Sequence, residues 1–320
     1  MPNTLSLVKT CLFYILIAYV FVFLLISPEC AKSECKSAIE LCLSTVVPVL
    51  FPFMVISDFV ITTGIADKVS YASGRVFAKV FNTSKISQIA FFCGTLFGFP
   101  LGAKTTVSLY ENGYIEKDEA ERLLCFCSNT GPGFVIGIAG GCLHDSTIGL
   151  VIYISQLLSA MTIGLFLRKR EPSISIASGV QYSGNKQYTP PFLCLTKSVS
   201  GSVMPTLNVC AFVCFFSVIK SSVNEILDYF GSSAYSSAFV TGFLEITNGL
   251  SCLSSLQVSM VTIFLASFFV GFSGLSVCMQ TMSLTSKTDL KTGRFFICKL
   301  IQGLLCAFFA VIICKYLKLY

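Results

Sequence analysis

Long apolar stretches recur along the whole chain and are separated by shorter polar stretches. A helix needs about 20 mostly apolar residues to cross a lipid bilayer. The stretches that approach or exceed this length lie at 11–27, 37–63, 86–108, 122–142, 147–167, 195–220, 236–256, 258–285 and 296–318. This pattern predicts an all-α polytopic membrane protein.

Two of these stretches contain residues that interrupt helices. Proline removes a backbone hydrogen bond and glycine weakens a helix. Broken backbone at membrane depth is tolerated inside protein or beside a water-filled cavity. We therefore expect 86–108 and 236–256 to form re-entrant hairpins, each entering and leaving the membrane on one face. The interrupting residues are Gly94, Gly98, Pro100 and Gly102 in the first stretch, and Gly242, Glu245, Asn248 and Gly249 in the second.

The distribution of basic residues supports the two hairpins, because cytoplasmic loops of membrane proteins carry an excess of Lys and Arg. With both hairpins on one face, the basic loops at 64–85, 168–197 and 286–299 all fall inside, and the loop at 221–235 falls outside. One feature opposes this topology: the basic C-terminal end then lies outside.

The two halves of the chain share short patterns. Val46-x-Pro48-x-Leu50 in the first half matches Val203-x-Pro205-x-Leu207 in the second. Three true spans in each half would turn the second copy upside down, and inverted repeats with broken helices place a binding site at the bilayer midplane. The predicted units are an anchor helix and short loop (1–36), a first repeat (37–170), a polar linker (171–194) and a second repeat (195–320).

Composition excludes a soluble protein, since 54% of the residues are hydrophobic, 12% are charged and the mean hydropathy is +0.79. The net charge of +6 does not indicate a nucleic-acid partner, because the basic residues cluster at the ends of apolar stretches. Most of the 16 cysteines lie inside apolar stretches and are interpreted as small core residues. We predict no metal and no cofactor.

No catalytic constellation is visible, so we predict that the protein is not an enzyme. The sole histidine, His144, belongs to a short polar turn, where a solvated side chain is the ordinary case. The charged segment 116–122 is interpreted as a solvated helix start.

The candidate substrate-binding residues lie at the interruptions of the apolar stretches. Gly98, Pro100, Gly102 and Lys104 expose backbone groups beside a cation, although a helix kink with a snorkelling lysine explains them equally well. A second interruption contains Asn129, Thr130 and Gly131, for which the alternative is a plain loop between two helices.

Polar residues of the second half complete the candidate site. Glu245 and Asn248 stand among apolar neighbours, and a carboxylate at depth is costly unless it binds a cation or carries a proton. The alternative is an interfacial carboxylate in a shallow segment. Asn208 and Gln280 are weaker candidates, because single amides often join helices.

Four motifs carry a resemblance to a known family. In order they are Pro48-Val49-Leu50-Phe51-Pro52-Phe53, Gly98-Phe99-Pro100-Leu101-Gly102-Ala103-Lys104, Glu119-Ala120-Glu121-Arg122-Leu123-Leu124 and Asn129-Thr130-Gly131-Pro132. Together they resemble the YlbJ family of sporulation integral membrane proteins, which carry the nucleoside-recognition or gate domain. The motifs cover roughly residues 40–140, and the remainder fits the family in length and hydropathy.

The resemblance implies a multi-pass protein of the bacterial inner membrane, linked to spore cortex formation, with a fold related to concentrative nucleoside transporters. Its partners would be the lipid bilayer, a small polar or nucleoside-like solute, and other sporulation membrane proteins. We expect a transporter-like or gate protein. The alternative is a non-transporting membrane scaffold that organises spore-envelope assembly.

Overall fold

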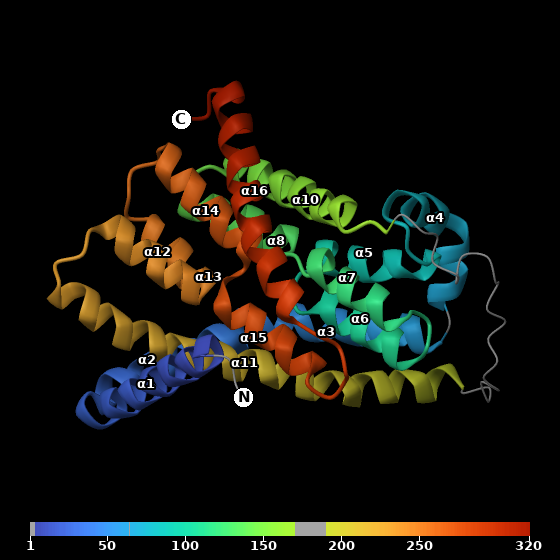
Figure 1. Ribbon diagram of the computed structural model, residues 1–320, viewed down its shortest axis with the longest axis horizontal. Coiled ribbons are helices and arrows are strands. Elements are labelled where there is room, and N and C mark those ends of the chain that lie inside the picture. Colours follow the sequence, from blue (N-terminus) through green and yellow to red (C-terminus); the bar gives the residue numbers. More distant parts are fainter. Residues whose placement is uncertain (1–3, 64, 170–189) are drawn as a thin grey trace.

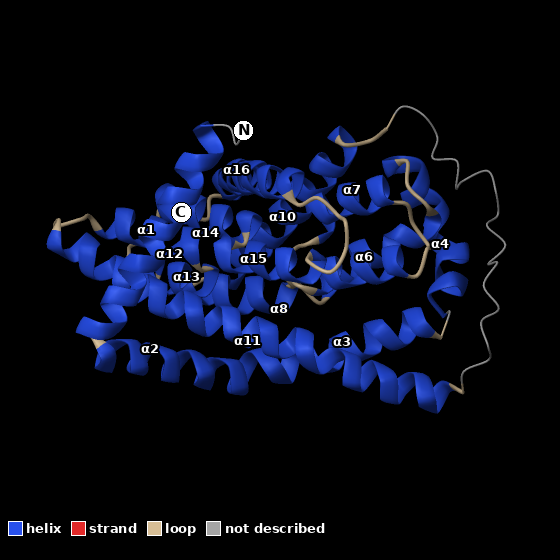
Figure 2. Ribbon diagram, turned by 60° about the horizontal axis from the view of Figure 1, so that its bottom comes forward, coloured by secondary structure: helices blue, strands red, loops and turns tan. Residues whose placement is uncertain are grey.

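The computed structural model describes residues 4–63, 65–169 and 190–320 of the chain. These residues are almost entirely helical and include no β-strand, as Figure 2 shows. In the first half the helices are α1 (Thr4–Ile26), α2 (Pro28–Leu41), α3 (Val47–Thr62), α4 (Ile65–Phe81), α5 (Gln88–Leu96), α6 (Leu101–Glu111), α7 (Lys117–Cys127), α8 (Pro132–Phe134), α9 (Gly140–Cys142) and α10 (Ser146–Phe166). In the second half they are α11 (Pro191–Tyr229), α12 (Ala234–Leu244), α13 (Ile246–Leu253), α14 (Met260–Phe272), α15 (Gly274–Thr285) and α16 (Gly293–Leu317).

Three short helical turns of other types join these helices. They are η1 (Cys42–Val46) and η3 (Val135–Ala139), which have the wide π-type turn, and the tighter η2 (Lys85–Ser87). With η3, the segments α8 and α9 form one continuous helical stretch from Pro132 to Cys142.

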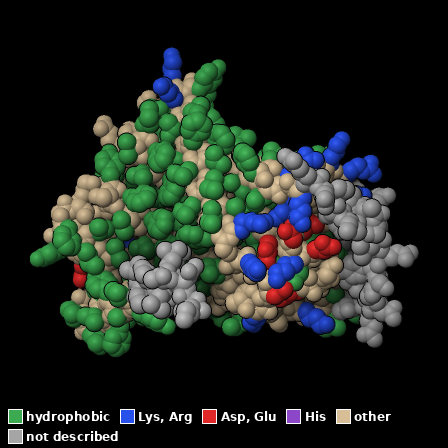
Figure 3. Space-filling model, in the orientation of Figure 1, with side chains coloured by type: hydrophobic (Ala, Val, Ile, Leu, Met, Phe, Trp, Pro, Cys, Tyr) green, Lys and Arg blue, Asp and Glu red, His purple; other side chains and the backbone are tan. Residues whose placement is uncertain are grey.

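Long apolar helices confirm the membrane class. Within the described ranges, five helical stretches are long and apolar enough to cross a membrane, and six if the pair α1–α2, bent by 104°, counts as one more. The five are Lys117–Cys142, Ser146–Phe166, Pro191–Leu227, Met260–Thr285 and Gly293–Leu317. In Figure 3, hydrophobic side chains cover much of one face, and charged side chains gather toward one end. The protein is therefore a multi-pass membrane protein.

The two halves follow the same order of elements. Each has a leading helix (α3, α11), a helical hairpin (α5–α6, α12–α13), a broken span (α7–α9, α14–α15) and an unbroken helix (α10, α16). The first half also contains α4, between α3 and its hairpin. Helices α2 and α3 pack along α11, and α16 packs between α10 and α14 (Figures 1 and 2). The inversion of the second half, and the side of the membrane that each loop faces, stay predictions.

A helical hairpin forms at each of the two expected places, and each is closed by a contact between two glycines. That each hairpin enters and leaves the membrane on one face stays a prediction. A β-carbon added to Gly102 would lie 2.9 Å from the Gly94 α-carbon and 2.0 Å from the Cys127 carbonyl oxygen. A β-carbon on Gly249 would lie 2.1 Å from the Gly242 α-carbon. The glycines therefore let the two arms of each hairpin approach backbone to backbone.

Several stretches expected to be loops are helical instead. Residues 28–36 belong to α2, most of 64–85 forms α4, and α11 continues through 221–229. Polar helices that pack on apolar ones have no long apolar stretch of their own, so their hydropathy resembles that of loops. Most of the expected linker, residues 171–189, lies outside the described residues, and its last residues belong to α11.

Two charged residues at the start of α7, Glu119 and Arg122, are buried, so the expectation of a solvated segment was wrong for them. Glu119 accepts hydrogen bonds from the Ser84 amide at 2.6 Å, the Ser84 hydroxyl at 2.7 Å and the Ser87 hydroxyl. The buried Arg122 donates to Asp118 at 3.1 Å and to a carbonyl at the end of α4. These bonds replace the water that the charges lose.

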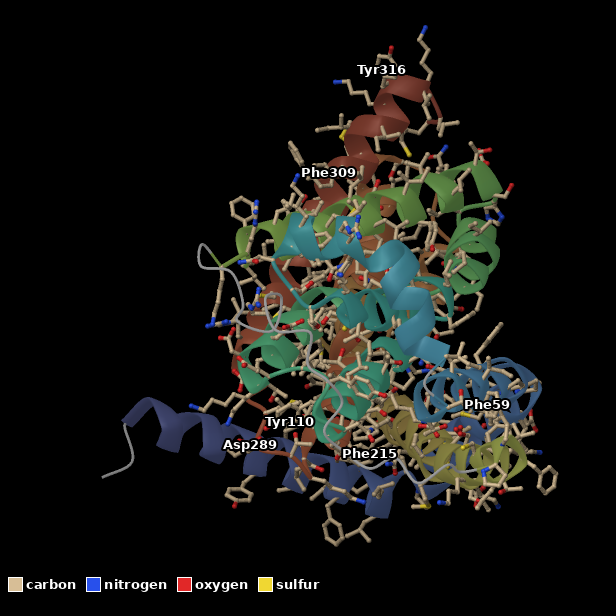
Figure 4. The ribbon with its side chains drawn as sticks, turned by 90° about the vertical axis from the view of Figure 1, so that its right-hand side faces the viewer. Phe59, Tyr110, Phe215, Asp289, Phe309 and Tyr316 are labelled. Atoms are coloured by element: carbon tan, nitrogen blue, oxygen red, sulfur yellow. The ribbon has the colours of Figure 1, made fainter. Side chains whose placement is uncertain are left out.

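An exposed polar cluster ties the loop before α16 to the first half. Asp289 accepts hydrogen bonds from Lys117 at 2.7 Å and from Tyr110 at 2.6 Å, and Figure 4 labels Asp289 and Tyr110 side by side. The bond from Lys117, followed by that from Tyr110, holds the pKa of the Asp289 carboxyl below its ordinary value.

We expect Gly102→Ala to lower the melting temperature of the purified protein, because the methyl group would collide with the Cys127 carbonyl. Overpacking of this kind costs about 1–3 kcal/mol. Gly141→Ala is the matched control, since its methyl group would meet no atom within 4 Å and alanine favours a helix. Thermal unfolding in detergent compares the two variants. Equal melting temperatures would show that the glycine contact does not hold the hairpin.

Candidate functional site

One cavity of about 570 Å³ lies where the interruptions of both halves meet. Its walls come from α3, α11 and α15 and from the breaks after α5, α7 and α12. The lining residues are Val46, Leu50, Phe53, Leu96, Phe97, Gly98, Phe99, Thr130, Gly131, Pro132, Gly133, Phe134, Ile138, Val209, Val213, Glu245, Ile246, Thr247, Val277 and Gln280. Mostly apolar walls with a few polar groups are typical of a small-molecule site.

In the first half, the break of the hairpin touches the break of the span. Gly98 has φ +87°, which a residue with a side chain rarely adopts, and it precedes the cis peptide bond to Pro100. A β-carbon on Gly98 would lie 2.8 Å from the Gly131 amide nitrogen. The two interruptions thus form one polar backbone surface on the cavity.

The second half repeats this arrangement. Glu245 has φ −145° and ψ 122°, so it separates α12 from α13. The break of the following span, at Ser273 and Gly274, has positive φ values of 73° and 79°. A β-carbon on Gly274 would lie 3.2 Å from the Ile246 amide nitrogen, so these two breaks are also in contact.

Glu245 is buried, with 4% of its surface exposed, and it caps the start of α13. Its Oε2 atom accepts from the Asn248 amide nitrogen at 2.8 Å and from the Asn248 side chain at 2.9 Å. The Asn248 side-chain oxygen Oδ1 in turn accepts from the Lys220 ammonium at 3.5 Å, and Lys220 also pairs with Glu34 at 2.9 Å. A carboxylate at a helix N-terminus is favoured by the helix dipole.

Gln280 supplies a second polar group to the cavity. Its side chain is 3% exposed, and its Nε2 atom donates to the Ser276 hydroxyl at 3.4 Å. Within the described part of the chain, its Oε1 atom has no hydrogen-bond partner. A buried acceptor without a partner is costly, so a donor inside the cavity would stabilise it.

Phenylalanine rings form the apolar part of the wall. Phe53 of α3 stacks on Phe97 with ring centroids 4.3 Å apart, and Phe99 meets Phe134 edge to face at 6.5 Å. The stack joins α3 to the first hairpin and gives the cavity flat apolar faces.

Comparisons with known proteins give one informative match. No family model matches the sequence, and no solved structure matches it. The sporulation integral membrane protein YlbJ of Bacillus subtilis (strain 168) is 27% identical over an alignment 337 positions long, which covers 94% of this chain and 83% of the relative. The chain is a homologue of YlbJ. The resemblance carried by the four motifs is therefore confirmed, and it extends far beyond residues 40–140.

The structure of this YlbJ homologue places five of the eleven sequence-predicted site residues in the cavity wall: Gly98, Thr130, Gly131, Glu245 and Gln280. Pro100, Asn129 and Asn248 adjoin those residues along the chain but do not line the cavity. The remaining candidates, Gly102, Lys104 and Asn208, lie elsewhere, as described next.

These three residues have other surroundings. Gly102 contacts Gly94 within the hairpin. Lys104 donates to the Ser202 hydroxyl of α11 at 3.1 Å. Asn208 is exposed on α11. His144 lies in an exposed turn with φ 55°, as its sequence context predicted.

Three polar residues that bind the break between α7 and α8 were not among the residues predicted from the sequence. Gln156 of α10 donates to the Thr130 carbonyl at 2.8 Å and accepts from the Thr130 amide at 3.3 Å. Gln302 of α16 donates to Asn129 at 2.8 Å, and Lys299 donates to the Ser128 carbonyl at 2.8 Å. Each is a polar residue inside an apolar stretch, and that position was the available signal.

We expect Gln156→Leu to destabilise the YlbJ homologue, because it leaves the Thr130 amide and carbonyl buried without their partner. Each buried group left unpaired costs about 1–3 kcal/mol. Gln257→Leu, at an exposed position, is the control. Thermal unfolding of both purified variants measures the difference. A melting temperature for Gln156→Leu that matches the control would show that the break does not need this clamp.

Proposed function

We propose that the protein is a membrane transporter or gate for a small solute and that the solute binds in the cavity between the two halves. The observation that carries this proposal is the meeting of the broken helices of both halves around one cavity that contains Glu245 and Gln280. Broken helices in corresponding positions of two repeats are the typical binding site of secondary transporters. A volume of about 570 Å³ also suits a small organic molecule.

The wall chemistry favours an uncharged or cationic solute. Glu245 is the sole charged residue among the described residues that line the cavity. An anion would therefore meet a carboxylate without a basic side chain to offset the repulsion. The phenylalanine rings suit a flat apolar group, and Glu245 and Gln280 suit hydrogen-bond donors. A nucleoside-like molecule without a phosphate meets these requirements.

The cellular role is proposed from the relative. The printed name of YlbJ describes a sporulation integral membrane protein. We propose that this chain acts in the same process, in the bacterial cell membrane, and contributes to spore cortex formation as a carrier rather than an enzyme. Other sporulation membrane proteins would be its partners.

One observation favours the alternative, a non-transporting scaffold that organises spore-envelope assembly. The Glu245 carboxylate already accepts two hydrogen bonds from Asn248, so it has a structural role without any solute. A scaffold would need the packed helices but not an open cavity. A substitution that fills the cavity should therefore inactivate a transporter and leave a scaffold active.

We expect Gly133→Leu to abolish sporulation of a strain in which the variant replaces the native protein, because the leucine side chain would narrow the cavity. Gly133 lines the cavity, and a β-carbon there would meet no atom within 4 Å, so the fold should accept the change. Gly137→Leu is the matched control: it lies one helical turn further on, with equally open space, and it does not line the cavity. Normal spore counts for both variants would favour the scaffold.

The substitution Glu245→Gln removes the negative charge of the side chain but keeps its size and shape. A glutamine oxygen can still accept from the Asn248 amide, so the melting temperature should change little. If the carboxylate binds a cationic group or a proton, spore formation should fall in the complemented strain. Normal sporulation together with an unchanged or raised melting temperature would remove Glu245 from the site.

A further inference from the structure

The break between α7 and α8 contains a buried ammonium group that the proposed solute site does not use. Lys299, in the second turn of α16, is 1% exposed. Its Nζ atom donates to the Ser128 carbonyl at 2.8 Å and to the Gln302 Oε1 atom at 3.0 Å. Ser128 and Gln302 are themselves fully buried, so the ammonium has no access to water.

Within the ranges that the structure describes, this charge is not paired with a carboxylate. Among the ion pairs of the described residues, none includes Lys299. An unpaired buried charge is strongly unfavourable unless dipoles and hydrogen bonds offset its lost hydration. Its hydrogen-bond acceptors are two neutral oxygens, and one of them belongs to the cap at the end of a helix.

The position of the ammonium explains how it is tolerated. Helix α7 ends at Cys127 with Ser128 as its cap, and α16 packs against α7 (Figure 1). The last carbonyls of a helix have no partner inside the helix and carry partial negative charge. The Lys299 ammonium lies against this end and binds a carbonyl that the broken helix leaves free.

The same chemical environment binds metal cations in other membrane proteins. In secondary transporters with broken helices, unwound backbone carbonyls and the C-terminal ends of half-helices coordinate the coupling cation. A carbonyl oxygen, an amide oxygen and a helix C-terminus surround the Lys299 Nζ atom. A monovalent cation would suit this environment equally well.

We propose that Lys299 is a tethered cation that occupies the place where a cation-coupled carrier would bind a monovalent ion. The break is therefore held together without a bound sodium or potassium ion. This inference rests on the proposed function in one respect: solute movement through the cavity would not depend on an ion bound at this break. Lys299 is a positioning residue, since it acts on the break through Ser128 and Gln302.

Removal of the side chain should create a site for an external cation. Lys299→Ala keeps the carbonyl and amide oxygens but leaves the space of a propylammonium group. The expected result is a lower melting temperature that n-propylammonium chloride restores saturably and by more than it shifts the native protein, since a ligand that binds the folded state stabilises it. n-Propanol, which has no charge, should not restore it.

Lys299→Met is the matched control, because methionine fills a similar volume without the charge. It should be destabilised and should not respond to propylammonium, since its side chain occupies the space. A Lys299→Met variant as stable as the native protein would overturn the proposal, because the charge would then be dispensable. Equal responses of Lys299→Ala and Lys299→Met to propylammonium would also overturn it.

The native protein gives a test that does not depend on either variant folding. Its melting temperature should stay the same when sodium or potassium chloride is replaced by choline chloride at equal ionic strength. A saturable rise with sodium or potassium would show that an external cation binds the fold and would overturn the proposal. These measurements read stability alone, so they remain valid if the Gly133 experiment shows that the protein does not transport.

Discussion

Every backbone group that a broken helix leaves unpaired inside a membrane protein must find another partner, because the bilayer core offers none. This chain breaks its helices in at least four places, at 97–100, 128–131, 245 and 273. The breaks meet in pairs, and their free groups are taken up by side chains from other helices or by the cavity. The glycine contacts, the buried amides and the buried lysine all follow from this requirement.

The two halves supply partners for the unpaired backbone groups at their helix breaks in different ways. In the first half, long polar side chains from α10 and α16 reach the span break and bind its backbone. In the second half, Glu245 caps α13 from within the break itself, and Ser273 bonds locally to Val270. Val270 also accepts from Thr130, so a hydrogen bond at 3.2 Å joins the span breaks of the two halves. The cavity lies beside this junction.

The sequence predicted the elements whose signal is local. Glycine and proline identified both hairpins, and the Asn129 and Gly131 interruption marked the first broken span. The break at Ser273 was missed, because glycines such as Gly271 and Gly274 are common in unbroken membrane spans. Glu119 and Arg122 were misjudged for another reason: adjacent charges resemble a solvated helix start until a distant segment supplies their hydrogen bonds.

The residues of the candidate site could likewise be predicted only where their signal in the sequence is local. Gly98, Thr130 and Glu245 could be selected because they stand at interruptions, and they line the cavity. Lys104 and Asn208 stand near similar signals, but the direction of a side chain around its helix depends on tertiary packing. Lys299 was overlooked because it lies near the end of a predicted span, where a lysine is expected to extend to the interface.

The glycine contacts have a mechanical consequence. Backbone packed directly on backbone has no long side chains between the arms that could rearrange, so each hairpin is stiff along its length. A displacement of α5–α6 or α12–α13 is then a movement of the whole unit. The bending falls to the connections at its ends, where Asn82, Gly113 and Gly231 already have positive φ values of 50°, 73° and 62°. In this architecture each hairpin is a rigid body, and the short turns at its ends are the hinges.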